Sequence, residues 1–247
     1  MGADVAAIIP AAGAGRRFGG RVSKPFSLIL REPLLAHTLR VFQRSPAVRW
    51  IVLVVRPEDR TPARRLLARY RITKALEPCL GGPSRAASVA RGMAAVPHDA
   101  AWVLVHDAAR PCVSLQLIQR VVRAARAHGA VACGLPASLT VKAVDDSRDV
   151  RLTLDRETLW FVQTPQVFRR DWFTQALARA NGDLASFPDD AAIVESAGFA
   201  VRMIPGDPLN IKVTTKDDLL LAHAILQRRK KNGARRLHGS AAHSSMS

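Results

Sequence analysis

The chain has 247 residues, 48% of them hydrophobic and only 5% aromatic, so its apolar mass suits one α/β domain built from Ala, Val, Leu and Ile. It carries 37 Lys and Arg against 20 Asp and Glu, and this net charge of +17 attracts anions such as phosphorylated metabolites or nucleic acid. No apolar run reaches the roughly 18 residues of a membrane span. With a single Tyr, the chain also offers no aromatic stacking platform for nucleic acid. We therefore expect neither a membrane nor a nucleic-acid partner.

Two features concern the cellular compartment. The first ten residues lack a basic region and lead directly into a strand-like run, so we expect no signal peptide. The cysteines, Cys79, Cys112 and Cys133, are far apart and form no Cys-x-x-Cys pair, which indicates neither a disulfide framework nor a zinc site. The expected location is the reducing cytoplasm.

Strands and helices are expected to alternate along the first half of the chain. Short continuous apolar runs predict buried strands at 5–10, 50–55, 102–106 and 131–135. Stretches with helical spacing predict helices at 33–43, 57–70, 84–95 and 114–128. This alternation is typical of βαβ units, so we expect a mostly parallel central sheet flanked by helices, with ligands at the carboxyl ends of the strands.

The pattern changes between residues 137 and 160. Polar and apolar residues alternate on both sides of a polar turn at 145–148, which predicts a protruding β-hairpin arm. Because an isolated hairpin is only marginally stable in water, we expect the arm to pack against a partner subunit. Further elements are expected after the arm: helices at 170–181 and 190–196, a strand at 200–204 and a helix from 216 to 229.

The C-terminal segment, residues 228–247, is expected to be a disordered basic tail. It contains six Lys and Arg residues and ends in Ser, Ala and His without an apolar period. We therefore expect a single domain over residues 1–227, with the arm as part of it.

The loop at 10–24 follows the first predicted strand and is rich in Gly and Arg. Small residues let backbone N–H groups approach a phosphate or a base closely, while Arg and Lys supply positive charge. The spacing fits neither a Walker P-loop nor a dinucleotide fingerprint. The loop is thus either an anion-binding loop of another kind or a flexible basic turn.

Two further loops follow predicted strands. Gly81 and Gly82 precede a helix, whose first amides can bind an anion, although Ser84 can equally be an ordinary N-cap. Asp107 comes directly after a buried strand, where it can hold a ribose hydroxyl or a magnesium ion, or form a structural pair with Arg110. His106 is expected to be a hydrogen-bonded residue at the strand end and not an acid–base group.

Five motifs that carry these loops occur in a fixed order. They are Pro-Ala-Ala-Gly-x-Gly-Arg-Arg followed by Lys24, Gly81-Gly82-x-x-Arg85-x-x-Ser88-Val89, Val105-His106-Asp107-Ala108-Ala109-Arg110-Pro111, Leu159-Trp160-x-x-Gln163-Thr164-Pro165-Gln166-x-Phe168 and Asn210-Ile211-Lys212-Val213-Thr214. Together, over about residues 5–226, they resemble the 2-C-methyl-D-erythritol 4-phosphate cytidylyltransferase family of isoprenoid biosynthesis. The resemblance implies a Rossmann-like nucleotidyltransferase fold with a protruding β-arm, and a homodimer formed through that arm. It also implies transfer of CMP from CTP to a sugar-alcohol phosphate, with Mg²⁺ bound mainly by the CTP phosphates.

The resemblance assigns roles to matching residues. The phosphates of CTP would be held by the catalytic residues Arg17, Lys24 and Lys212. The rest of the nucleotide would be bound by Ala11, Ala12, Gly13, Gly82, Ser88, Asp107 and Ala108. Asp107 would also lie near the magnesium ion. The sugar phosphate would be bound by Arg110, Thr140 and Arg156, the last two reaching from the arm into the neighbouring subunit's site.

The chemistry of such a transfer suits the residues present. The attacking phosphate monoester is largely ionised at neutral pH, because its second pKa is about 6. In-line attack on the α-phosphorus therefore requires no general base, which agrees with the lack of a Ser/His/Asp constellation. What the reaction needs is cations and amides that offset the growing negative charge.

The chain departs from the family pattern mainly on the sugar side, at Leu139, Pro188 and Ala192. These departures keep open a related acceptor, a pentitol phosphate such as ribitol 5-phosphate, although the opening Pro-Ala-Ala-Gly favours methylerythritol phosphate. On the nucleotide side, Pro83 replaces a frequently acidic residue, so recognition of the base there must use the backbone. The alternative of another class is a non-catalytic protein that binds anions or nucleic acid through its +17 charge.

Overall fold

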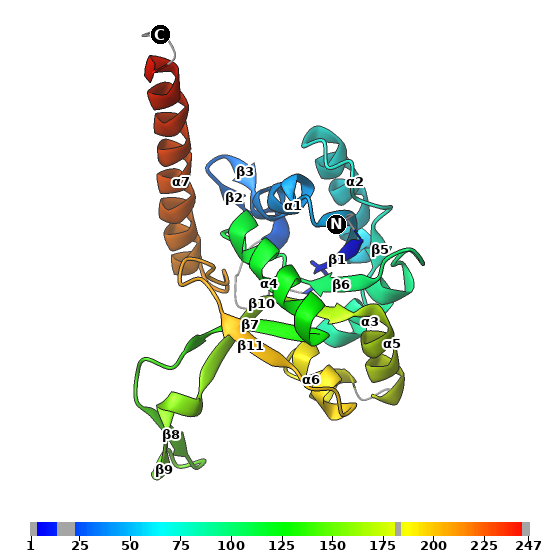
Figure 1. The fold of residues 1–247 in the computed structure, drawn as a ribbon, viewed down its shortest axis with the longest axis vertical. Helices are drawn as coiled ribbons and strands as arrows, with labels where there is room; N and C mark the ends of the chain where they lie inside the picture. The colour runs from blue at the N-terminus through cyan, green and yellow to red at the C-terminus, as the bar shows by residue number, and fades with distance from the viewer. Residues whose placement is uncertain (1–3, 14–22, 181–183, 244–247) are drawn as a thin grey trace.

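The computed structural model describes residues 4–13, 23–180 and 184–243. Its centre is a seven-stranded sheet in the order β11-β7-β10-β6-β1-β4-β5 (Figure 1). The strands are β1 (Val5–Pro10), β4 (Val48–Val55), β5 (Cys79–Leu80), β6 (Trp102–Val105), β7 (Ala130–Pro136), β10 (Trp160–Arg169) and β11 (Arg202–Pro205). All neighbouring pairs are parallel except those made by β10, which runs antiparallel to both β6 and β7. The expected mostly parallel sheet is confirmed.

Helices cover both faces of this sheet, and the side-chain alternation of β1 decides which helix packs where. Val5, Ala7 and Ile9 belong to the core cluster formed with α1 (Leu34–Arg44), α2 (Arg60–Arg69) and α4 (Leu115–His128). Ala6 and Ile8 point to the other face and pack with α3 (Arg85–Ala94), α5 (Arg170–Arg179) and α6 (Asp190–Ser196). Because both faces are covered, the parallel strands β1 and β6 are apolar along their whole length, as the sequence suggested.

β10 is a central strand that the sequence analysis did not predict. It lies between β6 and β7, with Gln166 opposite Val105 on one side and Ala132 on the other. Its polar residues Gln163, Thr164 and Gln166 are buried, and its pairing with β7 is irregular between Gln163 and Gln166. A polar, irregular strand gives neither the continuous apolar run nor the strict alternation by which strands are recognised.

The arm is a two-stranded antiparallel sheet of its own, β8 (Val141–Val144) and β9 (Val150–Leu154), followed by the 3-10 turn η3 (Arg156–Thr158). It projects from the body of the molecule (Figure 1). The predicted hairpin is thus confirmed.

The last helix, α7, spans Lys216–His243 and corrects the expectation of a disordered tail from residue 228. Its first part is anchored to the body: Ala222 is buried with Ile29, Leu34 and Val213, and Arg229 donates a hydrogen bond to the carbonyl oxygen of Cys112 at 2.6 Å. The helix then continues away from the body (Figure 1). Residues 226–236 are mostly Leu, Gln, Arg, Lys and Ala, which are strong helix formers, so the charge of the segment and its lack of an apolar period were a poor guide to its structure.

Smaller elements complete the described chain. They are β2 (Leu28–Ile29), β3 (Glu32–Pro33), and the 3-10 helices η1 (Lys24–Phe26), η2 (Pro57–Asp59) and η4 (Leu184–Ser186). Among the described helices, none combines the length and the apolar character that a bilayer crossing requires.

Candidate active site

A cavity of about 670 Å³ lies at the carboxyl edge of the sheet. Its walls come from five segments that are far apart in the sequence, 10–13, 24–25, 82–88, 107–109 and 212–214, together with Leu34 at the start of α1. The segments converge because the parallel strands β1 and β6 end at the same edge, as is usual for ligand sites in α/β sheets. Each of the described loops singled out from the sequence therefore contributes to one site.

The wall formed by residues 10–13 and 81–88 is built from closely packed backbone. Ala11 donates a backbone hydrogen bond to Val54 at 2.7 Å, which extends the β1–β4 pairing by one residue. A Cβ atom on Gly81 would collide with the side chain of Ala12, and one on Gly82 would lie 2.7 Å from that of Ala87. Gly81 is therefore required by the close approach of the two loops, and Gly82 by the tight turn that leads into α3. Gly13, in contrast, borders open space.

Two serines fix the turn that leads into α3. Ser84 is an N-cap, since its side chain accepts a hydrogen bond from the backbone N–H of Ala87 at 3.1 Å. The hydroxyl of Ser88 accepts from the N–H of Gly82 at 3.1 Å and donates to the carbonyl oxygen of Ser84 at 2.9 Å. The structure therefore supports the cap role of Ser84, and it gives Ser88 a part in shaping the cavity wall.

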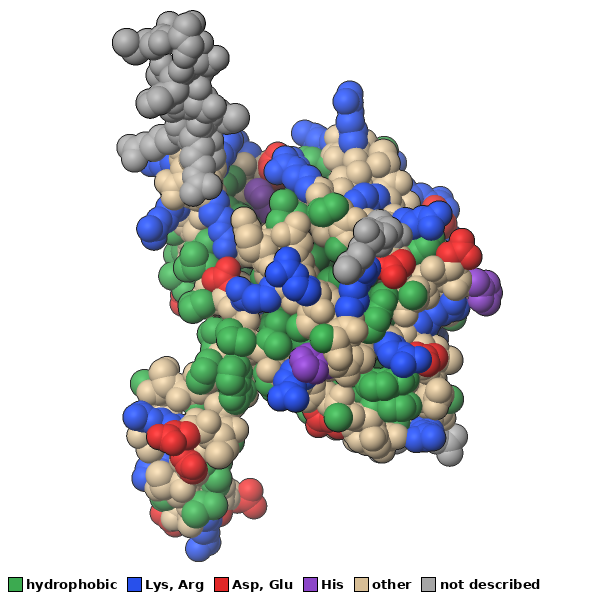
Figure 2. All heavy atoms as spheres, viewed as in Figure 1, with side chains coloured by type: hydrophobic (Ala, Val, Ile, Leu, Met, Phe, Trp, Pro, Cys, Tyr) green, Lys and Arg blue, Asp and Glu red, His purple; other side chains and the backbone are tan. Residues whose placement is uncertain are grey.

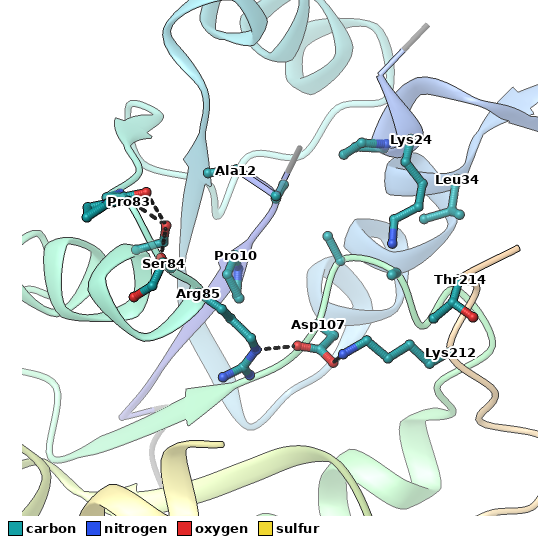
Figure 3. Close-up of a pocket in the computed structure, with 17 residues that line it drawn as sticks. Pro10, Ala12, Lys24, Leu34, Pro83, Ser84, Arg85, Asp107, Lys212 and Thr214 are labelled. Atoms are coloured by element: carbon teal, nitrogen blue, oxygen red, sulfur yellow. Dashed lines mark hydrogen bonds and ion pairs between the residues drawn. The ribbon is translucent and has the colours of Figure 1, made fainter. Parts of the chain in front are cut away.

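Asp107 is the charged centre of the cavity. Its Oδ2 lies 2.7 Å from Lys212 Nζ and its Oδ1 lies 2.9 Å from Arg85 Nε (Figure 3). Arg110 is farther away, with its Nε 3.8 Å from Oδ2. Burial by itself would raise the pKa of Asp107, but the neighbouring cations outweigh it and hold the pKa well below the usual range. Asp107 is therefore an ionised carboxylate held by Lys212 and Arg85 more closely than by Arg110.

Lys24 and Lys212 lie at the same cavity, as expected. Both line it, and Lys24 Nζ donates a hydrogen bond to the carbonyl oxygen of Val213, the residue after Lys212, at 3.2 Å. Figure 3 shows the two side chains extending into the cavity from different parts of the chain. Arg17, the third predicted phosphate ligand, lies outside the described residues.

Arg110 lies behind the cavity instead of lining it. It is 9% exposed and donates a hydrogen bond to the carbonyl oxygen of Asn210 at 2.9 Å. Burial lowers the pKa of Arg110 from its ordinary value, although Asp107 works in the opposite direction. In this position Arg110 supports the 210–214 segment that carries Lys212.

Thr140 and Arg156 are on the arm, and both are exposed. Arg156 donates a hydrogen bond to the carbonyl oxygen of Ser138 at 3.3 Å. Neither residue lines the cavity of its own chain. Their predicted action in the site of a neighbouring subunit stays a prediction.

His106 is fully buried and hydrogen-bonded at both ring nitrogens. Nε2 lies 3.2 Å from the carbonyl oxygen of Arg110 and Nδ1 lies 3.0 Å from Thr164 Oγ1. Burial lowers the pKa of His106 to about 4, so the ring is neutral at physiological pH. This geometry agrees with the structural role expected from the sequence.

Sequence reasoning missed three residues that hold the site together. Thr164, on β10, accepts a hydrogen bond from the backbone N–H of Asp107 at 3.0 Å, and Asn210 donates to the carbonyl oxygen of Thr164 at 2.7 Å. Arg85 joins α3 to Asp107. All three are in the quoted motifs, but a motif does not show which of its polar residues face one another.

The donor set suits a divalent cation that arrives with a ligand. Among the described residues lining the cavity, Asp107 is the one acid, and no group of three or more His, Cys, Asp or Glu in that part of the chain is placed to hold a metal. Proteins commonly bind Mg²⁺ through one or two carboxylates together with substrate phosphates. Asp107 fits that mode of binding and not an all-protein metal cage.

The fold and the cavity define a class. A basic cavity at the carboxyl edge of a mostly parallel sheet, with a glycine-containing wall and a helix N-terminus, is typical of an α/β protein that binds a nucleotide. A model of the 2-C-methyl-D-erythritol 4-phosphate cytidylyltransferase family matches residues 5–228. The chain belongs to this family.

Individual relatives agree with the family match. The chain is 39% identical, over 92% of its length and 97% of the relative's, to the 2-C-methyl-D-erythritol 4-phosphate cytidylyltransferase of Desulforamulus reducens. Its fold resembles the crystal structure of 4-diphosphocytidyl-2C-methyl-D-erythritol synthase from Anaerococcus prevotii, with a TM-score of 0.78 and 30% identity over 90% of this chain and 96% of that one. The Francisella tularensis cytidylyltransferase gives a TM-score of 0.77 and 30% identity over 90% and 99% of the two chains. The expected nucleotidyltransferase fold is confirmed.

Proposed function

We propose that this protein transfers CMP from CTP to 2-C-methyl-D-erythritol 4-phosphate, giving 4-diphosphocytidyl-2-C-methyl-D-erythritol and pyrophosphate. The observation that carries the proposal is the convergence of Lys24, Lys212 and Asp107 on one cavity in a chain of this family. The relatives named above carry the name of this activity, and they do not favour the pentitol phosphate alternative.

The nucleotide would lie along the wall of small residues. Ala11, Ala12 and Gly13 on one loop, and Gly82 on the other, leave backbone groups accessible at the cavity. Pro83 has no acidic side chain to offer a base, so hydrogen bonds from the backbone would recognise the cytosine. Asp107 and Ala108, at the end of β6, would then meet the ribose.

The two lysines would stabilise the transition state. The phosphate of the acceptor is already ionised and attacks the α-phosphorus in line with the departing pyrophosphate. Negative charge accumulates on the phosphate oxygens as this occurs. Lys24 and Lys212, which reach the cavity from two different segments of the chain, would offset that charge. Mg²⁺, when bound with the CTP phosphates near Asp107, would supply further charge neutralisation. Asp107 would hold Lys212 at the cavity wall, because their ion pair is 2.7 Å long.

The arm would complete the site of a second copy of the chain. Its strands and root expose several apolar side chains, which are costly to leave in water and suit a subunit interface (Figure 2). They are Leu139, Val144, Val150, Leu152, Phe161 and Val162. A homodimer formed through this surface would bring Thr140 and Arg156 to the partner's cavity, where they would bind the sugar phosphate.

A cytoplasmic location is part of the proposal. All three cysteines are free thiols, and two of them are buried. Burial raises the pKa of Cys112 to about 11 and that of Cys133 to about 12, so neither is a reactive thiolate. Unpaired cysteines of this kind suit a reducing compartment.

The choice of acceptor can be tested directly. We expect the purified protein with CTP and Mg²⁺ to release pyrophosphate when 2-C-methyl-D-erythritol 4-phosphate is added, and to do so much more slowly with ribitol 5-phosphate. Mass spectrometry of the cytidylylated product checks the result. Turnover with ribitol 5-phosphate alone would replace the proposed acceptor, and no turnover with either would contradict the proposal.

Replacing Arg156 with alanine tests the role of the arm. We expect the KM for the sugar phosphate to rise about tenfold, the size of losing a hydrogen bond to a charged group, while the KM for CTP changes much less. Arg151→Ala is a matched control on the same arm, because Arg151 is 72% exposed and pairs with Asp145. Equal changes in both KM values, or equal effects of the two substitutions, would contradict the assignment.

A further inference from the structure

Asp190 is a buried carboxylate that the proposed chemistry leaves without a role. It is the first residue of α6 and has no exposed surface. Its Oδ2 accepts a hydrogen bond from Arg85 at 2.8 Å, whereas its Oδ1 is buried without a hydrogen-bond partner in the described chain. Burial raises the pKa of Asp190 although Arg85 opposes this. A buried charge is a weak source of stability, so its presence beside the cavity calls for another explanation.

Arg85 connects Asp190 to the cavity. Its Nε donates to Asp107 Oδ1 at 2.9 Å, and a terminal nitrogen donates to Asp190 Oδ2 at 2.8 Å. A guanidinium group can bind one carboxylate through two parallel hydrogen bonds, which is its strongest arrangement. Here the donors are divided between two carboxylates, so Asp107 receives one hydrogen bond from Arg85 instead of two.

This division decides what Asp107 presents to the cavity. Because Arg85 holds Oδ1, the other oxygen, Oδ2, is left for Lys212 at 2.7 Å (Figure 3). Asp190 itself does not line the cavity, so it cannot touch a nucleotide bound there. Any effect of Asp190 on the site must pass through Arg85.

We propose that Asp190 is a positioning residue, which holds one terminal guanidinium nitrogen of Arg85 and thereby fixes the orientation of Asp107 and of Lys212 beside it. Without the Asp190 carboxylate, Arg85 is free to donate two hydrogen bonds to Asp107, one to each carboxylate oxygen. The Oδ2 atom of Asp107 would then turn away from the cavity. This inference rests on the proposed function, since it concerns the nucleotide site of that reaction.

The test compares two neighbouring isosteric substitutions. Asp190→Asn removes the charge that anchors Arg85. Asp189→Asn is the matched control: Asp189 caps α6 by accepting from the N–H of Ala192 at 2.9 Å, and its other oxygen accepts from Gln166 at 3.0 Å. Asparagine is an equally good N-cap and loses only the bond from Gln166, and Asp189 has no hydrogen bond or ion pair with Arg85 among the described residues. Calorimetric titration with CTP and Mg²⁺ in the absence of acceptor gives the Kd, and thermal unfolding reports whether each variant is folded.

We expect Asp190→Asn to weaken CTP binding about tenfold, the effect of losing a charged hydrogen bond, and Asp189→Asn to leave it unchanged. The KM for the sugar phosphate should change little in either variant. A lower unfolding temperature of Asp190→Asn with an unchanged Kd would show that Asp190 only stabilises the fold, and would overturn the proposal.

A double-mutant cycle tests the route through Arg85. In an Arg85→Gln background, Asp190→Asn should have no further effect on the Kd for CTP, because the residue on which it acts is gone. Additive effects would show that Asp190 acts by another route, and would also overturn the proposal.

A crystal structure of Asp190→Asn separates this inference from the proposed function, since it requires no nucleotide. In that structure we expect Arg85 to donate two hydrogen bonds to Asp107. A single hydrogen bond, unchanged from the parent protein, would refute the positioning role. If the parent protein fails to bind CTP, the proposed function fails, while the crystal structure still decides the role of Asp190.

Discussion

Replacing Lys212 with alanine is expected to lower kcat by about a hundredfold or more, the cost of removing one group that stabilises transition-state charge. Lys212 is 2.7 Å from Asp107 and its side chain is 41% exposed at the cavity, so the ammonium group can reach a phosphate without unpacking the core. The thermal unfolding temperature should change little for the same reason. Steady-state rates of pyrophosphate release at saturating CTP and acceptor measure the effect.

Lys216→Ala is a suitable control for this change. Lys216 begins α7, is exposed and does not line the cavity, so its loss alters the net charge equally without touching the site. We expect its kcat to stay near that of the parent protein. If Lys212→Ala retained a rate near that of Lys216→Ala, the assigned role of Lys212 in the transition state would be wrong.

Replacing Lys24 with alanine is expected to lower kcat/KM for CTP by about a hundredfold. Lys24 begins η1, lines the cavity and donates to the carbonyl oxygen of Val213 at 3.2 Å, which places its charge next to the segment that carries Lys212. Its loss would leave the pyrophosphate group with less positive charge as it departs. Steady-state kinetics with CTP as the varied substrate measure the effect.

Lys24→Met separates the charge of Lys24 from its packing. Methionine keeps a long apolar stem but has no ammonium group, so the two Lys24 variants should lose activity to the same extent. A Lys24→Met protein with near-parental kcat/KM would show that the stem alone matters and that Lys24 does not bind phosphate.

The sequence determined the repeating part of the fold and the kind of ligand. Short continuous apolar runs rich in Val and Ile, such as 50–55, favour strands buried on both faces, and the spacing of residues such as Leu34, Leu35 and Leu39 fits a helix that packs on them. The Gly-rich and basic loops after these strands predicted an anion site because strand ends share one edge of a parallel sheet. The five ordered motifs then indicated the family, which the comparisons confirm.

Only the tertiary structure decided which polar groups face one another. Thr164 contacts Asp107, and Arg85 contacts Asp190, across 57 and 105 positions of the chain. Such pairs depend on how β10 inserts antiparallel between β6 and β7, and no local pattern encodes that pairing. The C-terminal helix is a second example: a helix was expected to end at residue 229, whereas α7 continues to His243 although the segment has many charges and no apolar period. Periodicity reports which face of an element is buried, whereas a polar network depends on side-chain directions that only the packed chain fixes.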